Sequence, residues 1–137
     1  MGSSTVAVTP NASDGFKTFF LVAALWDLFL GAAFFVFFGA IYDALHLTLP
    51  NNTGYIQMVA GFVFVQGAGY WMVYRDMARN RDIVRLGALY KVIFAGVVFY
   101  YLAIGQSPGA VFTWFAAGDL LFIAGFLRFL AGMRDGK

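Results

Sequence analysis

The chain has 137 residues, of which 61% are hydrophobic and only 12% are charged, whereas a soluble domain carries roughly 25% charged residues. This composition predicts an integral membrane protein with a single domain. The absence of cysteine excludes disulfides, thiolate metal sites, iron–sulfur clusters and dithiol redox chemistry. The net charge is only +2, and nucleic acid is not an expected partner.

The first sixteen residues are polar and are predicted to form a flexible cytoplasmic arm, residues 1–16. Four apolar stretches follow, near 18–42, 55–75, 86–104 and 110–132. Each is long enough for a helix to cross about 30 Å of hydrocarbon, and helices are required because lipid cannot satisfy an open strand edge. We therefore expect an all-α membrane protein, an antiparallel four-helix bundle over residues 17–132, with a short cytoplasmic tail at 133–137.

The connections between the apolar stretches differ in charge. Residues 43–52 and 105–109 contain turn-forming residues but no Lys or Arg. The middle connection, residues 75–85, contains four arginines: Arg75, Arg79, Arg81 and Arg85. Under the positive-inside rule, this connection and both termini lie in the cytoplasm. The same arginines could also contact anionic lipid headgroups of the bilayer, although fixing the topology is a sufficient role for them.

Ionisable residues inside the apolar stretches mark a candidate site, because charge is costly there and usually serves a function. At 1.5 Å per residue, Asp27 lies about 14 Å, Asp119 about 12 Å and Gln66 about 16 Å inside the respective stretches, close to the midplane. Lys91 lies about 8 Å inside the third stretch, from where it can reach a carboxylate or extend outward to water. The predicted ligand- or ion-binding residues are Asp27, Gln66, Lys91 and Asp119. Alternatively, these groups only join the helices.

Aromatic residues share the helix faces of these polar groups, and Trp26, Tyr70 and Phe122 are the predicted pocket aromatics. A carboxylate among aromatic rings suits an organic cation. The alternative is plain packing, since the chain contains 17 phenylalanines. In the fourth stretch, glycines recur every seven residues at 118, 125 and 132, which favours close helix packing or an oligomer contact.

Cofactor and metal sites are not predicted. The single histidine, His46, has no second ligand for haem nearby in the sequence, and two aspartates with a glutamine are too few for a metal site. No phosphate-binding glycine loop or nucleophile elbow is present, so no catalytic residues are assigned.

The segment GYWMVYRDMARNRDIVRLGALYKVIFAG, residues 69–96, has a helix ending in Arg-Asp, an arginine-rich turn, and Gly and Lys in the next helix. It resembles small four-span bacterial membrane proteins of the DoxX-like kind. The resemblance implies a protein of the bacterial inner membrane, in some cases an accessory partner of membrane oxidoreductases, and it transfers no functional residues.

Three functions remain open at this point. The first is a non-enzymatic membrane protein that binds or moves a proton, a small cation or an amphiphile, with transport requiring a homo-oligomer. The second is an accessory or structural subunit of a larger membrane complex, possibly a redox complex, in which the buried polar groups serve helix packing. An enzyme acting on lipid or quinone is the third.

Overall fold

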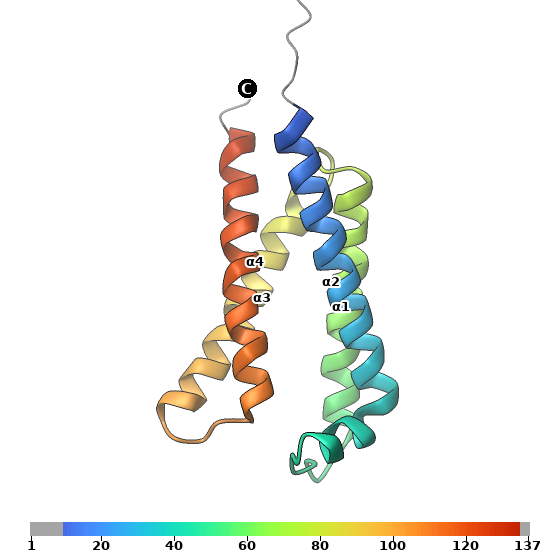
Figure 1. The fold of residues 1–137 in the computed structure, drawn as a ribbon, viewed down its shortest axis with the longest axis vertical. Coiled ribbons are helices and arrows are strands. Elements are labelled where there is room, and N and C mark those ends of the chain that lie inside the picture. The colour runs from blue at the N-terminus through green and yellow to red at the C-terminus, as the bar shows by residue number, and fades with distance from the viewer. Residues whose placement is uncertain (1–9, 135–137) are drawn as a thin grey trace, which may run out of the picture.

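The computed structural model of the protein describes residues 10–134, and the side chains of residues 14–132. These residues form four helices: α1 (Pro10–Ala44), α2 (Gly54–Arg75), α3 (Arg81–Ala103) and α4 (Ala110–Arg134) (Figure 1). Each helix contains a stretch long and apolar enough to cross a membrane. The prediction of an all-helical chain with four membrane-length apolar helices is therefore confirmed.

The ends of the helices differ slightly from the predicted stretches. Residues 1–9 of the predicted arm and 135–137 of the predicted tail lie outside the described residues. Helix α1 already begins at Pro10, a residue that the first turn tolerates because its missing N–H would have no partner in the helix. Helix α2 ends where the Asn80 side-chain amide donates hydrogen bonds to the carbonyls of Met72 and Asp76, each at 2.9 Å.

The helices pack as two pairs. Helix α1 lies along α2 and α3 lies along α4, whereas the backbones of α2 and α3 come close over a shorter length and those of α1 and α4 at few positions. The first pair is very close because glycines face the neighbouring backbone. A Cβ at Gly31 would lie 2.6 Å from the backbone N of Phe64, and one at Gly67 would lie 2.6 Å from the backbone N of Leu28. Only glycine permits this approach.

The two pairs meet near the end of the molecule where α1 begins and α4 ends, at the top of Figure 1. There a compact apolar core takes residues from all four helices, and we call it the terminal cluster: Phe20, Ala23, Ala24, Tyr70, Val73, Val84, Ala88, Phe126 and Phe129. Its rings are in contact, and Phe20 stacks on Phe126 with centroids 5.7 Å apart. The terminal cluster therefore joins the two pairs at this end.

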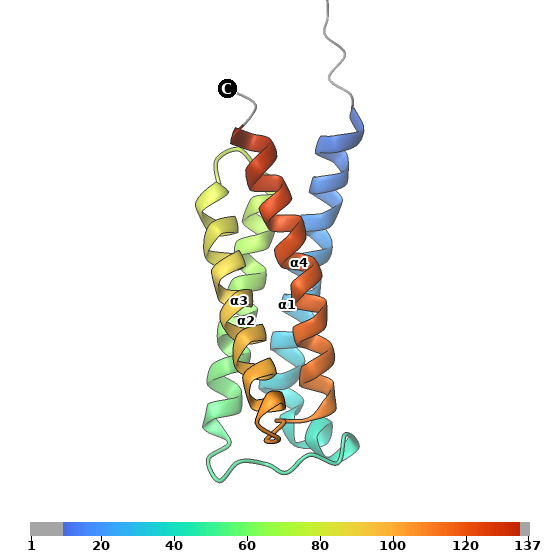
Figure 2. The ribbon, with the colours of Figure 1, turned by 90° about the vertical axis from the view of Figure 1, so that its left-hand side faces the viewer.

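Towards the opposite end the pairs separate (Figure 1). Helix α1 is interrupted there at Phe37, which has non-helical φ and ψ of −110° and 22°. The side-chain amide of Gln57 in α2 donates a 3.1 Å hydrogen bond to the carbonyl of Phe35 beside this interruption. The connection from α1 to α2 then crosses this end of the molecule (Figure 2).

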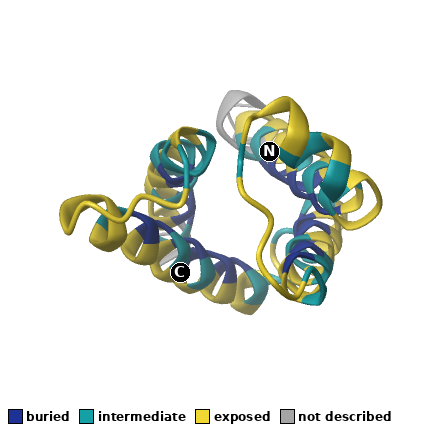
Figure 3. Cartoon of the chain, turned by 90° about the horizontal axis from the view of Figure 1, so that it is seen from below, coloured by how far each residue is buried: buried dark blue, intermediate teal, exposed yellow. Residues whose placement is uncertain are grey.

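The outer faces of the helices are apolar and exposed. Buried positions lie on the sides where helices face one another, and the outward sides are exposed (Figure 3). Phe29, Trp114 and Leu121 are among the large apolar side chains that stand on these outer sides, with exposed fractions above 70%. Such a surface is unfavourable in water and suits contact with lipid tails.

Candidate functional site

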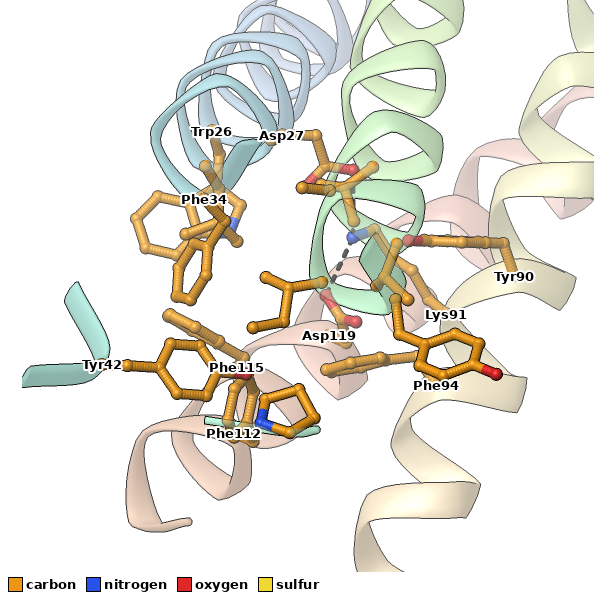
Figure 4. A pocket seen from close by; sticks show the side chains of 18 residues that line it. Trp26, Asp27, Phe34, Tyr42, Tyr90, Lys91, Phe94, Phe112, Phe115 and Asp119 are labelled. Carbon is orange, nitrogen blue, oxygen red and sulfur yellow. Dashed lines mark hydrogen bonds and ion pairs between the residues drawn. The ribbon is translucent and has the colours of Figure 1, made fainter. Parts of the chain in front are cut away.

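Three ionisable side chains from three helices meet in the interior. The ammonium Nζ of Lys91 in α3 donates a hydrogen bond of 2.8 Å to Oδ1 of Asp119 in α4. The same ammonium lies 3.5 Å from Oδ2 of Asp27 in α1. The exposed fractions of Lys91, Asp27 and Asp119 are 2%, 3% and 7%. We call these residues the ionic triad (Figure 4).

The local sequence of α3 explains why Lys91 turns inward. The buried face of this helix consists mainly of small residues, with Gly87 and Ala88 one turn before Lys91 and Ala95 one turn after it. These small side chains leave space for the long lysine stem. The ammonium then reaches the rings of Phe122 and Tyr70, whose centroids lie 4.9 and 5.7 Å from Nζ, and such contacts stabilise a cation.

The ionic triad is not balanced in charge. With all three groups ionised, two carboxylates oppose one ammonium, which leaves one negative charge in excess. The sharing is also unequal, because Lys91 bonds Asp119 directly, while the buried Oδ2 of Asp27 has no hydrogen-bond partner among the described residues. Buried polar atoms are normally paired. Asp27 is therefore the carboxylate with unused capacity for a positive partner.

The ionic triad lies at the inner end of a cavity of about 300 Å³. The lining takes in residues between 26 and 42 of α1, 55–63 of α2, 90–94 of α3 and 112–119 of α4, together with Pro50 from the connection. All of these positions lie at the level of the ionic triad or on the side of it that faces the α1–α2 and α3–α4 connections. On the other side lies the terminal cluster. The cavity is thus bounded by apolar packing at one end and extends from the triad towards the connection between α1 and α2.

Aromatic rings dominate the part of the cavity beyond the charges. The rings of Phe34 and Phe115 lie 6.2 Å apart, those of Phe34 and Tyr42 6.5 Å apart, and Phe112 is in contact with the same group. Trp26 joins it through Phe115. Figure 4 shows these side chains around the space in front of Lys91 and Asp119. The cavity therefore has a charged inner end and an aromatic outer part.

The four predicted polar residues have different places. Asp27, Lys91 and Asp119 come together and line the cavity. Gln66 is only half-buried on α2 and does not belong to the lining. Of the predicted aromatics, Trp26 lines the cavity, whereas Tyr70 and Phe122 lie against the ammonium of Lys91 outside the lining. The four arginines of the middle connection are exposed, and Arg85 forms an ion pair with Asp82.

Several residues of the cavity lining were not predicted from the sequence. Tyr90 and Phe94 of α3 line the cavity, and in Figure 4 the side chain of Tyr90 extends towards the ionic triad. Their spacing of four residues around Lys91 was a usable signal, because it places both on one side of the helix. Pro50 left no such signal, since it lies in the connection between α1 and α2.

Within residues 10–134 no group of three or more His, Asp or Glu side chains is close enough together to hold a metal ion. Comparisons with protein-family models, with curated proteins and with solved structures found no match for this chain.

Proposed function

We propose that this small integral membrane protein binds a positively charged or amphiphilic ligand, or a proton, at the ionic triad. The observation that carries the proposal is an excess carboxylate, Asp27, at the inner end of an aromatic-lined cavity of about 300 Å³. This volume lies within the range of small-molecule pockets. Ionisable groups inside membrane spans commonly mark substrate or ion pathways. Movement of the ligand across the membrane requires a further state, in which the terminal cluster opens, or an oligomer.

The proposal includes an orientation. We infer an antiparallel bundle in the bacterial inner membrane with both termini and the arginine-rich connection in the cytoplasm, because all nine Lys and Arg residues fall on that side or in its near half. The cavity then extends towards the outer side. The chain has no cysteine, so single variants Asn52→Cys and Arg79→Cys can be labelled in intact cells with an impermeant maleimide. We expect labelling of Asn52→Cys alone. Labelling of Arg79→Cys alone would show that the protein has the opposite orientation.

The binding proposal is tested by thermal unfolding of the purified protein in dodecylmaltoside. We expect 2-phenylethylammonium chloride to raise the melting temperature of the wild type more than sodium chloride at the same concentration, because a ligand that binds only the folded state stabilises it. The variant Val63→Trp should lose this response, since Val63 lines the cavity and the larger ring fills it. Val65→Trp is the matched control on the same helix, at a position that is 65% exposed.

Two outcomes count against binding in the cavity. One is an equal response of the wild type and Val63→Trp. The other is a melting temperature of the wild type that changes neither with 2-phenylethylammonium nor between pH 5 and pH 9. This result would exclude both an organic cation and a proton as ligands of the ionic triad.

A second candidate is an accessory subunit of a larger membrane complex. It is favoured by a groove of about 240 Å³ lined by residues of α1 and α4, including Trp26, Trp114 and Gly118. A transmembrane helix of a partner or of a second copy could pack there, because small residues permit close approach. Co-purification of a partner that is lost in Gly118→Leu, without any ligand response, would favour this candidate.

A further inference from the structure

The two carboxylates of the ionic triad make different contacts with Lys91. Asp119 accepts the 2.8 Å hydrogen bond from Lys91, and a charge-assisted bond of this length is among the strong ones. Asp27 lies 3.5 Å from the same ammonium, and its buried Oδ2 has no hydrogen-bond partner among the described residues. The Lys91–Asp119 pair is therefore neutral as a unit, and the charge of Asp27 is compensated only through the longer ion pair with the same ammonium.

The surroundings of Asp27 indicate the kind of charge that would compensate it. Lys91 is the only cationic residue among the described residues that line the cavity, and it is already held by Asp119. The lining beyond Asp27 is aromatic and aliphatic. The faces of aromatic rings attract cations, especially where water is excluded. An anion would meet the excess negative charge, so the cavity disfavours it.

The size of the cavity separates an organic cation from a bare ion. A cavity of about 300 Å³ is many times larger than the roughly 30 Å³ that one water molecule occupies in the liquid, and a metal ion needs several oxygen ligands around it. Among the described residues no cluster of three acidic or His side chains supplies them. The apolar rings Phe34, Phe112 and Phe115 instead offer contact area to carbon.

We propose that the ligand is a monovalent organic ammonium compound, with its charged nitrogen at Asp27 and its apolar part among the aromatic rings towards Tyr42. In this arrangement Asp27 is the binding residue. Asp119 is a positioning residue, which holds the Lys91 ammonium by a hydrogen bond of 2.8 Å and leaves it 3.5 Å from Asp27. The assignment rests on the proposed function, and it adds the class of ligand, the direction in which the ligand lies and the residue that binds its charge.

The first experiment needs no variant. Benzyltrimethylammonium and neopentylbenzene have the same shape, and only the former is charged; phenylacetate supplies an anion of similar size. Dissociation constants are measured on the purified wild type in detergent by tryptophan fluorescence, since Trp26 lines the cavity. We expect benzyltrimethylammonium to bind at least tenfold more tightly than either comparison compound. Equal binding of the neutral compound would overturn the ammonium assignment but leave a ligand-binding cavity. No binding of any of the three would also overturn the ammonium assignment, and of the proposed function it would leave only the binding of a proton.

The second experiment assigns the carboxylate. Asp27→Asn should weaken benzyltrimethylammonium binding at least tenfold. The double variant Lys91→Met/Asp119→Leu removes the neutral pair as a unit, with side chains of similar volume, and should bind benzyltrimethylammonium more tightly than the wild type, because Asp27 then has no ammonium of the protein within 3.5 Å to compete with the ligand. Asp119→Asn alone should weaken binding, because Lys91 is then released to pair with Asp27.

The reverse pattern, with binding kept in Asp27→Asn and lost in the double variant, would assign the ligand to Asp119. It would contradict the proposal that Asp27 binds the charged nitrogen. Melting curves show whether each variant is folded. If Asp27→Asn does not fold, Asp27→Glu replaces it, and a longer carboxylate side chain that preserves tight binding of the charged compound supports the assignment. Loss of the preference for the charged over the neutral compound is likewise expected in any folded variant without a carboxylate at position 27, and its retention there overturns the proposal.

Discussion

Lys91 and Asp119 form a buried hydrogen-bonded ion pair between α3 and α4, with 2.8 Å between Nζ and Oδ1. Both residues thus belong to the same helix pair. Asp27, which belongs to the other pair, is linked to Lys91 only by the longer contact of 3.5 Å. The ionic triad therefore stabilises the α3–α4 pair directly and attaches it to α1 more weakly.

This geometry predicts the effect of removing the lysine. In Lys91→Met two buried carboxylates lose their common cation, and breaking a buried pair in this way costs about 3–5 kcal/mol. The double variant Lys91→Met/Asp119→Leu should recover part of this loss, because it removes one of the two carboxylates left without a cation, while Asp27, which is 3% exposed, remains. Reversible unfolding in mixed micelles measures the free energy of unfolding for each variant. A double variant as unstable as Lys91→Met would show that Asp119 does not carry the main interaction of Lys91.

The approach of α1 and α2 at Gly67 makes a second prediction. A Cβ at this position would lie 2.6 Å from the backbone N of Leu28 and 3.0 Å from the backbone C of Asp27. Backbone atoms cannot rotate away, so Gly67→Ala must separate the helices, and overpacking of this kind costs about 1–3 kcal/mol. Because the displaced backbone carries Asp27, the variant should also weaken benzyltrimethylammonium binding.

Gly61→Ala is the matched control on α2. The nearest atom to a Cβ there belongs to the Phe35 ring at 3.9 Å, an ordinary contact distance. Alanine is favoured over glycine inside a helix by roughly 0.5–1 kcal/mol, so this variant should be as stable as the wild type or slightly more stable. Equal destabilisation by both substitutions would contradict the close α1–α2 approach at Gly67.

Gly87 permits the close contact between α2 and α3, as Gly67 does between α1 and α2. A Cβ here would lie 2.6 Å from the Tyr70 ring, and Tyr70 is fully buried within the terminal cluster. We expect Gly87→Ala to lower the free energy of unfolding by about 1–3 kcal/mol. Gly96→Ala on the same helix has open space around the added methyl group and should not destabilise the protein. The difference between the two melting temperatures measures the effect, and its absence would mean that Tyr70 can move aside.

Much of this arrangement could be predicted from the sequence. Hydropathy identifies the four helices because a helix that spans a membrane must be a long, continuous apolar segment, independent of the helices against which it packs. The rise per residue also places Asp27 and Asp119 at similar depth. Depth alone, however, does not say which side chains face each other. Gln66 has the right height, but its neighbour Gly67 is pressed against the backbone of α1, and Gln66 remains half-buried beside this contact, outside the cavity.

The inward turn of Lys91 could not be decided from the sequence, because a lysine near the end of a span can also extend towards water. The small residues on its own helix face and the presence of Asp119 opposite decide it. The glycines of α4 are a further example. Of Gly118, Gly125 and Gly132, only Gly125 faces a neighbour, the ring of Phe19; the regular spacing gave all three the same expected role.

The last prediction concerns access to the cavity. Val63 lines the cavity, whereas Val73 belongs to the terminal cluster and is fully buried. In proteoliposomes, a cysteine at position 63 should react with the water-soluble reagent methanethiosulfonate-ethyltrimethylammonium, since a thiol reacts as thiolate and needs access to water. Val73→Cys should react at least tenfold more slowly, and Val65→Cys, at a 65% exposed position on the outer side of α2, should be slow because it faces lipid.

Benzyltrimethylammonium should slow the reaction of Val63→Cys and leave the other two rates unchanged, because only Val63 shares the cavity with Asp27. Mass spectrometry of the modified protein gives each rate, and the native chain has no cysteine to interfere. Equal reactivity of Val63→Cys and Val73→Cys would mean that water crosses the terminal cluster, so that the cavity is open at both ends. If Val63→Cys instead reacts slowly and is modified only after the addition of denaturant, the aromatic rings near Tyr42 close the cavity at the end that faces the α1–α2 connection as well.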